Sequence, residues 1–144
     1  MVPHVMLSQI KRVREFNEEL IGQLFSQIGA EHVIPNRRFF EDEKNILLVA
    51  YGNSQPRGFL YAYLLEDIKG EQPKMFLYSI DVLESHRRKG IGTELIGVLK
   101  RVAKENSCSK IFVITNKSNV AAMALYKNTG GLFESDDDVV FVYQ

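Results

Sequence analysis

Three adjacent cations stand directly before two glycines in the segment SHRRKGIG, which runs from Ser85 to Gly92. The segment follows the apolar run MFLYSIDV and leads into an apolar stripe at helical spacing that begins at Ile91. Like charges side by side repel each other and glycine weakens regular structure, so this turn is costly unless it binds a ligand. The free amides at a helix start favour an anion, and three cations suit a pyrophosphate.

Two well-known phosphate loops do not fit this segment. A P-loop carries lysine and then serine or threonine after its last glycine, and Ile91–Glu94 holds no such pair. The dinucleotide fingerprint has a third glycine three residues after the second, where this chain has Leu95. Taken alone, the turn is explained equally well as a basic loop before a surface helix, with its glycines needed only for the turn.

Apolar periodicity along the rest of the chain predicts strands and helices. The expected elements, in chain order, are a strand at 4–10, a helix at 13–28, a loop or short helix at 30–44, a hairpin at 45–51 and 57–67, a strand at 75–82, a helix from 91, a strand at 110–115, a helix at 120–128, and a final hairpin at 132–135 and 139–144. This order predicts an α/β sheet wrapped by helices.

The composition is that of an ordinary globular protein and limits its class. The 144 residues suit a single domain, 1–144, and the 18 basic residues balance the 18 acidic ones. A dedicated nucleic-acid binder normally has a basic excess, so no nucleic-acid partner is expected. The single cysteine suits a reducing compartment, and no signal peptide or membrane span is indicated. We therefore expect a cytoplasmic protein with no membrane partner.

A second motif lies 27 residues after Gly92, where NVAAMALYKNTGG begins at Asn119. RRKGIG fits the pattern Arg/Gln-x-x-Gly-x-Gly/Ala. Together the two motifs resemble the coenzyme A pyrophosphate loop and the Asn-x-x-Ala-x-x-Leu-Tyr helix of the GNAT superfamily of N-acetyltransferases. The resemblance covers Met75 to Gly130, and EQPK, HRRKGIG and the short chain look most like the aminoglycoside 3-N-acetyltransferase branch.

The resemblance implies a fold and a coenzyme site. The fold would be α/β, with a mixed, mostly antiparallel sheet of about six to seven strands, about four helices and splayed central parallel strands. Ile80 and Val82 would pair through their backbone with the pantetheine arm of acetyl-CoA, and Asn119 would hydrogen-bond that arm from the later helix. The pyrophosphate would lie on the loop, at Arg87 and the backbone amides of Arg88, Lys89, Gly90, Gly92 and Thr93.

The resemblance also implies catalytic roles. The Val82 amide would polarise the acetyl carbonyl, and Tyr126 would give a proton to the leaving thiolate. Asp81 is the candidate general base for a substrate ammonium, whose pKa near about 10 requires deprotonation before attack. Strand alternation places Asp81 and Ser79 on one face and Tyr78 on the other, so Asp81 and Tyr78 can both face the cleft only if a bulge turns Asp81 round. A water relay in place of Asp81 is an equal alternative.

Other candidate groups are less specific. The acidic runs at 136–138 and 41–44 could hold a polycationic acceptor, and both are also ordinary turn or surface sequences. The three histidines have no ligand spacing, so no metal is expected. Cys108 has no identifiable base partner for a nucleophilic role, and we expect it to be a small buried residue.

The sequence therefore predicts an acetyl-CoA-dependent N-acetyltransferase that moves the acetyl group directly to a primary amine of a small molecule, with an aminoglycoside as the first candidate. A polyamine, an amino acid or a protein N-terminus is the alternative acceptor. A catalytically silent acyl-CoA-binding module is the alternative from another class, because no general base is obvious. The resemblance leaves a homodimer open, and the sequence identifies no interface for one.

Overall fold

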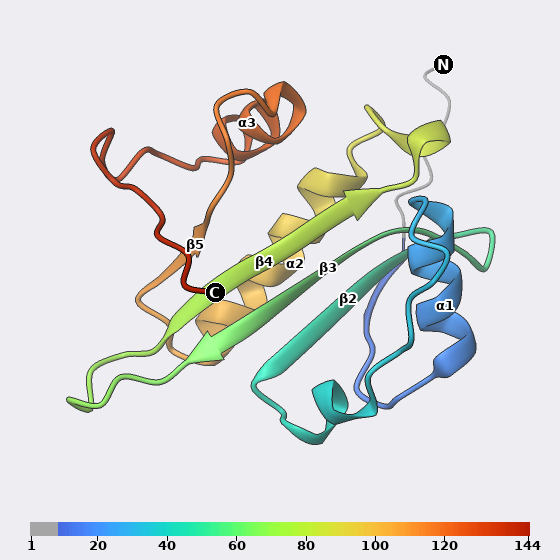
Figure 1. Cartoon of the computed structure of the whole chain (residues 1–144), viewed down its shortest axis with the longest axis horizontal. Coiled ribbons are helices and arrows are strands. Elements are labelled where there is room, and N and C mark those ends of the chain that lie inside the picture. The colour runs from blue at the N-terminus through green and yellow to red at the C-terminus, as the bar shows by residue number, and fades with distance from the viewer. Residues whose placement is uncertain (1–8) are drawn as a thin grey trace, which may run out of the picture. The chain divides into compact units, whose positions relative to one another are not determined.

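Ten elements of regular structure follow one another in the computed structural model, which describes residues 9–144 (Figure 1). The strands are β1 (Gln9–Arg12), β2 (Asn45–Gly52), β3 (Gln55–Leu65), β4 (Lys74–Val82) and β5 (Lys110–Val113). The helices are α1 (Glu18–Gln27), α2 (Ile91–Glu105) and α3 (Val120–Asn128), with short 3-10 helices η1 (Arg37–Glu41) and η2 (Glu84–His86). Residues 4–8 of the predicted first strand lie outside the described residues.

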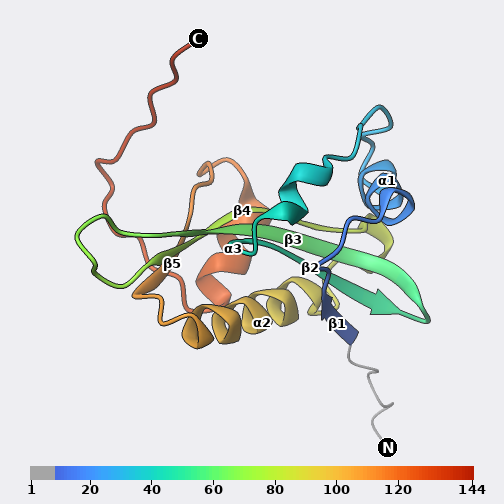
Figure 2. The same ribbon diagram turned by 90° about the horizontal axis from the view of Figure 1, so that it is seen from below.

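The strands form one mixed sheet in the order β1-β2-β3-β4-β5. Neighbouring strands are antiparallel except β4 and β5, which are parallel. A parallel pair needs a crossover connection, and α2 supplies it here. Figure 2 shows α2 on one side of the sheet and α1 with η1 on the other. The mixed α/β sheet that the sequence predicts is confirmed.

Both faces of the sheet are covered, which explains why β2 reads as a continuous apolar run. Leu47 and Val49 pack with Leu24 of α1 and Phe59 of β3 in one buried cluster. Leu48 lies between them in the strand and is fully buried, so it faces the opposite side, where α2 packs. The face that carries α1 is the one that concerns the site, because it bears the aromatic residues of β3.

The chain divides into two compact units. The first comprises the described residues up to Ile114 and contains the whole sheet together with α1 and α2. The second, Thr115–Gln144, contains α3. The segment SHRRKGIG and the strand before it therefore belong to the same unit.

The structure corrects the expected number of elements. The described residues hold five strands and three α-helices, in place of six to seven strands and four helices. The predicted final hairpin is wrong, because residues 132–144 form no strand and the side chains from Val139 to Tyr143 are exposed. A strand needs a partner for its backbone groups, and the second unit contains no other strand to provide one.

The first helix is also shorter than predicted. It begins after Asn17, whose side-chain oxygen accepts a hydrogen bond of 3.0 Å from the amide of Leu20 and so caps the helix. Val13, which the sequence places in the helix, instead donates its amide to the carbonyl oxygen of Leu47 at 2.9 Å. The end of the helix agrees with the prediction, because Gly29 follows the C-cap with a φ of 87°.

Candidate active site

A β-bulge at Tyr78 decides which residues of β4 face the α1 side of the sheet. Tyr61 of β3 pairs with Ser79, whereas the next residue, Ala62, pairs with Leu77, so Tyr78 has no partner on β3. Cross-strand partners point to the same face, so Ser79 shares the face of Tyr61. The Tyr78 ring also lies on this face, with its centroid 5.3 Å from that of Tyr61. Simple alternation of side chains along β4 predicted that Tyr78 and Ser79 lie on opposite faces. This prediction is wrong, because Tyr78 is an extra residue in β4 and both side chains lie on the α1 face.

The bulge also turns Asp81 toward this face, because Asp81 pairs with Phe59. Its carboxylate is half-buried and accepts a hydrogen bond of 3.5 Å from the hydroxyl of Ser79. Burial raises the pKa of Asp81, while the Ser79 hydrogen bond and the charge of Arg87 act in the opposite direction. A carboxylate whose pKa lies above its ordinary value is a better proton acceptor, so Asp81 suits the role of a general base.

The end of β4 presents unpaired backbone groups on the side away from β3. The amide of Leu83 donates to the carbonyl oxygen of Arg57 at 2.8 Å, and Val82 pairs with Gly58. In an antiparallel ladder this makes the Val82 pair a non-hydrogen-bonded one, so the N–H and C=O of Val82 point away from β3, and those of Ile80 do the same. The pairing of β4 with β5 ends at Leu77. β5 therefore does not pair with the predicted pantetheine-binding groups of Ile80 and Val82, and the carbonyl oxygen of Val82 accepts a hydrogen bond from Arg87 instead.

Arg87 links the loop to this strand end. Its Nε donates a hydrogen bond of 3.0 Å to the carbonyl oxygen of Val82. The sequence placed Arg87 at the first position of the phosphate loop, and the structure shows that part of its side chain contacts the protein backbone. Its charge still lies within electrostatic reach of Asp81.

The backbone of the loop is shaped for an anion. Arg88 and Gly90 adopt left-handed conformations, with φ of 64° and 84°, which turn successive amides to one side as in anion-binding nests. Gly90 is the N-cap of α2 and has no side chain to cap the helix. The amides of Gly92 and Thr93 lie in the first turn, where the helix itself offers them no acceptor. These groups fit a pyrophosphate.

Cations around the loop add to this preference. Arg88 and Lys89 are exposed. The pKa of His86 is lowered by desolvation and by the nearby positive charges of Arg57 and Lys89. Arg57, on β3, is thus a further cation beside the loop, and nothing in its local sequence marks it as part of the site.

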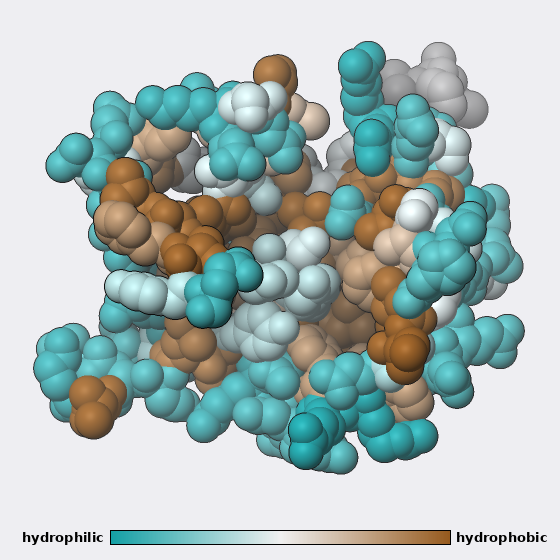
Figure 3. Space-filling view, viewed as in Figure 1, coloured by the Kyte–Doolittle hydropathy of each residue, from teal (hydrophilic) through white to brown (hydrophobic). Residues whose placement is uncertain are grey.

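An apolar hollow of about 240 Å³ opens on the α1 face. It is lined by residues of α1, η1 and the segment before it, β2 and β3, namely Ile21, Leu24, Phe25, Val33, Ile34, Pro35, Asn36, Phe39, Phe40, Leu47, Phe59, Tyr61 and Tyr63. Figure 3 views this face and shows apolar side chains gathered between the middle of the sheet and α1. Tyr61 belongs both to this lining and to the surroundings of Asp81, because its cross-strand partner is Ser79, which hydrogen-bonds Asp81.

Two predicted site residues belong to the second unit. Asn119 is the N-cap of α3, where its side-chain oxygen accepts a hydrogen bond of 3.1 Å from the amide of Ala122. Tyr126 lies on α3, and its carbonyl oxygen accepts a hydrogen bond of 2.7 Å from the amide of Gly131. Their roles toward the coenzyme remain predictions from the motif.

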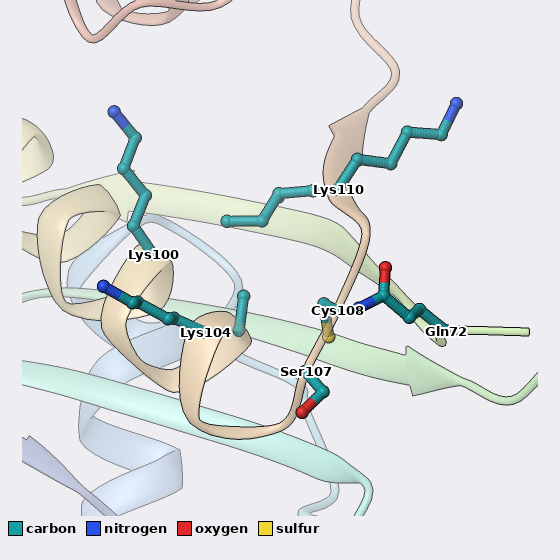
Figure 4. Close-up of a pocket in the computed structure, with 8 residues that line it drawn as sticks. Gln72, Lys100, Lys104, Ser107, Cys108 and Lys110 are labelled. Carbon is teal, nitrogen blue, oxygen red and sulfur yellow. The ribbon is translucent and has the colours of Figure 1, made fainter.

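A larger hollow, of about 420 Å³, lies at the C-terminal end of α2 and is lined by Lys100, Lys104, Cys108 and Lys110 among others (Figure 4). The ammonium group of Lys110 points away from those of Lys100 and Lys104, so the three charges do not converge. Burial raises the pKa of the half-buried Cys108 thiol, as does the charge of Glu66. A thiol that stays protonated is a poor nucleophile, so this hollow offers no catalytic group.

Residues 9–144 present neither a metal centre nor a membrane-spanning helix. No group of three or more histidine, cysteine or carboxylate side chains there is placed to hold a metal ion. No helix in the same range is both long and apolar enough to cross a membrane.

Residues 13–130 match the acetyltransferase (GNAT) family, and this span includes the strand, the loop and the helix described above. The chain belongs to the GNAT family. It is an N-acetyltransferase, and acetyl-CoA is its cosubstrate. This GNAT protein is 30% identical over 126 residues to the aminoglycoside N(6′)-acetyltransferase type 1 of Acinetobacter haemolyticus, and the match covers 85% of this chain and 86% of the relative.

Solved structures show the same fold. An aminoglycoside acetyltransferase, meta-AAC0020 from an uncultured soil metagenomic sample, in complex with sisomicin, matches with a TM-score of 0.82 at 23% identity, over 96% of this chain and 95% of the other. AAC(6′)-Iy in complex with a bisubstrate analogue matches with a TM-score of 0.78 at 21% identity, over 95% and 97% of the chains. The GNAT-like fold is confirmed. The names of the Acinetobacter relative and of AAC(6′)-Iy give the acetylated position of the aminoglycoside as 6′. The sequence motifs instead resembled the 3-N-acetyltransferase branch.

Three residues of the site were missed by the sequence analysis. Arg57 lies beside the loop only because β3 pairs with β4, which no local motif reveals. Ser79 was noticed only as a neighbour of Asp81, and its hydroxyl is a partner of the carboxylate. Tyr61 had a usable signal, because the run FLYAY places Phe59, Tyr61 and Tyr63 at the spacing of one strand face.

Proposed function

We propose that this protein transfers the acetyl group of acetyl-CoA directly to a primary amine of a small molecule, with Asp81 as the general base. The observation that carries the proposal is the position of Asp81, which is half-buried on the α1 face and adjacent to Val82, whose amide points away from β3. A proton acceptor and an oxyanion donor thus follow each other in one strand. This adjacency favours catalysis over a silent coenzyme-binding module.

The loop would hold the coenzyme through its pyrophosphate. We assign this contact to the backbone amides of the loop and first helical turn, with Arg87 at the first loop position; the amides are those of Arg88, Lys89, Gly90, Gly92 and Thr93. Their left-handed and helix-start geometry supports the assignment. The open backbone groups of Ile80 and Val82 would then pair with the pantetheine arm as an added strand does.

Acetyl-CoA supplies an activated acetyl group and a thiolate leaving group. Asp81 would accept one proton from the substrate ammonium, which makes the nitrogen lone pair available. The new bond joins this nitrogen to the acetyl carbon, while the Val82 amide stabilises the charge that develops on the acetyl oxygen. The carbon–sulfur bond breaks, and the second proton lost by the nitrogen balances the proton that the thiolate gains.

Two further roles come from the helix motif. Asn119 uses its side-chain oxygen to cap α3, so its NH₂ group is the one that we assign to the coenzyme arm. Tyr126 is assigned to proton donation toward the thiolate, because a tyrosine hydroxyl can act as a general acid. Both assignments rest on the motif positions.

Aminoglycosides are the first acceptor class to test, because the Acinetobacter relative is named for them and is 30% identical. The acidic run at 41–44, which lies in the same unit as the apolar hollow, contributes no residue to its lining. Asp42 is engaged in its own turn, where its side chain accepts a hydrogen bond of 2.9 Å from the amide of Lys44. Polyamines, amino acids and protein N-termini remain the alternatives.

Thiol release from acetyl-CoA by the purified protein, measured against a panel of these amines, tests the proposal. We expect release with one amine class, and loss of release in Asp81→Asn with coenzyme A binding retained. Coenzyme A binding by calorimetry without turnover on any amine would favour the silent module. Absence of coenzyme A binding would overturn the assignment of the loop.

A further inference from the structure

We propose that the acceptor is an amine that carries one apolar ring close to its amino group, as in an arylalkylamine, and that this ring occupies the hollow on the α1 face. The inference rests on the proposed function, since it takes Asp81 as the base that meets the amino group. It departs from the acceptors for which the aminoglycoside relatives are named.

The lining of the hollow sets the chemistry of its occupant. Among the described residues that line it, none carries a charge, and the polar ones are Asn36, Tyr61 and Tyr63. The side-chain oxygen of Asn36 is already used, because it accepts a hydrogen bond of 3.0 Å from the amide of Arg38. Apart from the one amino group that meets Asp81, the ammonium groups of a polycation bound here would lose their hydration without gaining a carboxylate partner in the lining.

A cation lies beside the aromatic wall, at the end where Phe40 lines it. The guanidinium of Arg37 stacks over Phe16 at 4.3 Å from the ring centroid. Phe16 in turn contacts Phe40, which lines the hollow, edge to face at 6.1 Å. A cation beside the wall further disfavours an acceptor with several ammonium groups.

The shape and the walls of the hollow suit one ring. Its volume of about 240 Å³ lies below the roughly 300–1,000 Å³ that is common for drug-sized ligands. Phe39 meets Tyr61 and Tyr63 edge to face, with centroids 6.1 Å and 5.9 Å apart. Aromatic rings prefer such edge-to-face contacts, and a ligand ring can extend the same array.

The hollow is connected to the base through Tyr61. Tyr61 lines the hollow and is the cross-strand partner of Ser79, whose hydroxyl donates to the carboxylate of Asp81 at 3.5 Å. Phe59, also in the lining, is the cross-strand partner of Asp81. Directly opposed side chains begin about 4.5–5.5 Å apart. A ring in the hollow with an amine on a short linker can therefore bring its nitrogen to Asp81.

The test compares three amines in the thiol-release assay with the full-length protein: 2-phenylethylamine, ethylamine and sisomicin. Burial of one ring predicts a kcat/KM for 2-phenylethylamine at least about tenfold above that for ethylamine, with sisomicin the poorest acceptor. Equal or better turnover of ethylamine or sisomicin would overturn the inference and leave the proposed acetyl transfer intact.

A pair of variants ties the preference to the hollow. Val33→Asp places a carboxylate in the lining at a residue that is 38% exposed, so the protein should still fold. We expect it to lower kcat/KM for 2-phenylethylamine about tenfold and to raise it for sisomicin. Ile68→Asp makes the same change at a fully exposed apolar residue outside the lining and should alter neither value. Equal effects of both variants would overturn the inference.

A binding measurement by calorimetry tests the inference even if the enzyme acetylates none of the three amines. 2-Phenylethylamine should bind the complex of the protein with coenzyme A in calorimetry, and Val33→Asp should weaken that binding. Coenzyme A binding without 2-phenylethylamine binding would overturn the inference alone. Failure of coenzyme A itself to bind would overturn the proposed function, and the inference with it.

Discussion

The Nε of Arg87 lies 3.0 Å from the carbonyl oxygen of Val82, so a hydrogen bond joins the phosphate loop to the end of β4. Val82 is also the residue whose amide we assign to the acetyl oxygen. One side chain thus fixes the distance between the groups that would hold the coenzyme and the group that would stabilise the reacting carbonyl. Coenzyme binding and chemistry should therefore respond together to its loss.

Arg87→Ala should raise the KM for acetyl-CoA and lower kcat. The lost hydrogen bond is worth about 1 kcal/mol, which corresponds to about a fivefold loss of kcat/KM, shared between the two constants. Arg88→Ala is the matched control, because it removes an equal charge from the same loop without removing the bond to Val82 and should raise KM alone. Steady-state kinetics measures both variants, and a fall in kcat for Arg88→Ala as large as that for Arg87→Ala would contradict the special role of Arg87.

Asp81→Asn should lower kcat by about 10²–10⁴-fold, the usual contribution of a general base. The affinity for coenzyme A should stay unchanged, because the loop does not use this carboxylate. Thiol release and calorimetry measure the two quantities separately. A variant with nearly full kcat would show that a water relay, not Asp81, accepts the proton.

Activity should fall as the pH drops through the raised pKa of Asp81, because the protonated carboxyl group cannot accept a proton. The Ser79 hydrogen bond favours the charged form of Asp81, so Ser79→Ala should raise the pKa further and move the acidic limb of kcat/KM to higher pH. The limb is measured from kcat/KM over a pH series in both proteins. A shift to lower pH would contradict this account of the carboxylate.

Gly90→Ala should destabilise the protein and weaken coenzyme binding. A Cβ in the left-handed region costs roughly 1–2 kcal/mol, and Gly90 has a φ of 84°. Gly97→Ala is the same substitution at an exposed site inside α2, where a Cβ would meet nothing within 4 Å. That change should stabilise the protein by about 0.5–1 kcal/mol. Denaturant unfolding measures both, and the prediction fails if the two substitutions shift stability in the same direction.

Tyr126→Phe should lower kcat with little effect on coenzyme A affinity or on stability, if the hydroxyl donates a proton to the thiolate. A silent coenzyme-binding module would show no measurable change in any quantity. The variant is measured by thiol release together with calorimetry. An unchanged kcat in an active enzyme would remove Tyr126 from the mechanism.

The strands around the site were predictable because each is an apolar run bounded by turn residues. The runs at 45–51 and 57–67 correspond to β2 and β3, and α2 begins at Ile91 as its apolar stripe predicts. The prediction of the final hairpin was wrong, although its residues are typical of strands. The segment VVFVYQ has strand composition, but a strand forms only when another strand pairs with it, and composition does not report a partner.

The site was predictable where it is local in sequence. The loop and the end of β4 are neighbours along the chain, so their residue types and spacing were enough to predict a phosphate site there, and this role stays a prediction. The hollow was not predictable, because its lining comes from α1, the segment around η1, β2 and β3, which meet only in the folded chain. The pairing register of β3 and β4 decides on which face of the sheet Asp81 lies. The sequence of β4 alone does not predict this register.

The bulge at Tyr78 occupies a position where neither the side chain nor the residue itself is needed to orient Asp81. Tyr78 is 56% exposed, so many other side chains could occupy the place. Deletion of the residue would leave Ser79 opposite Tyr61 and Asp81 opposite Phe59, because Leu77 and Ser79 already pair with the adjacent residues Ala62 and Tyr61. A lineage carrying this gene can therefore vary or lose residue 78 and keep the carboxylate on the α1 face. Straightening of β4 with residue 78 retained would instead turn Asp81 toward α2.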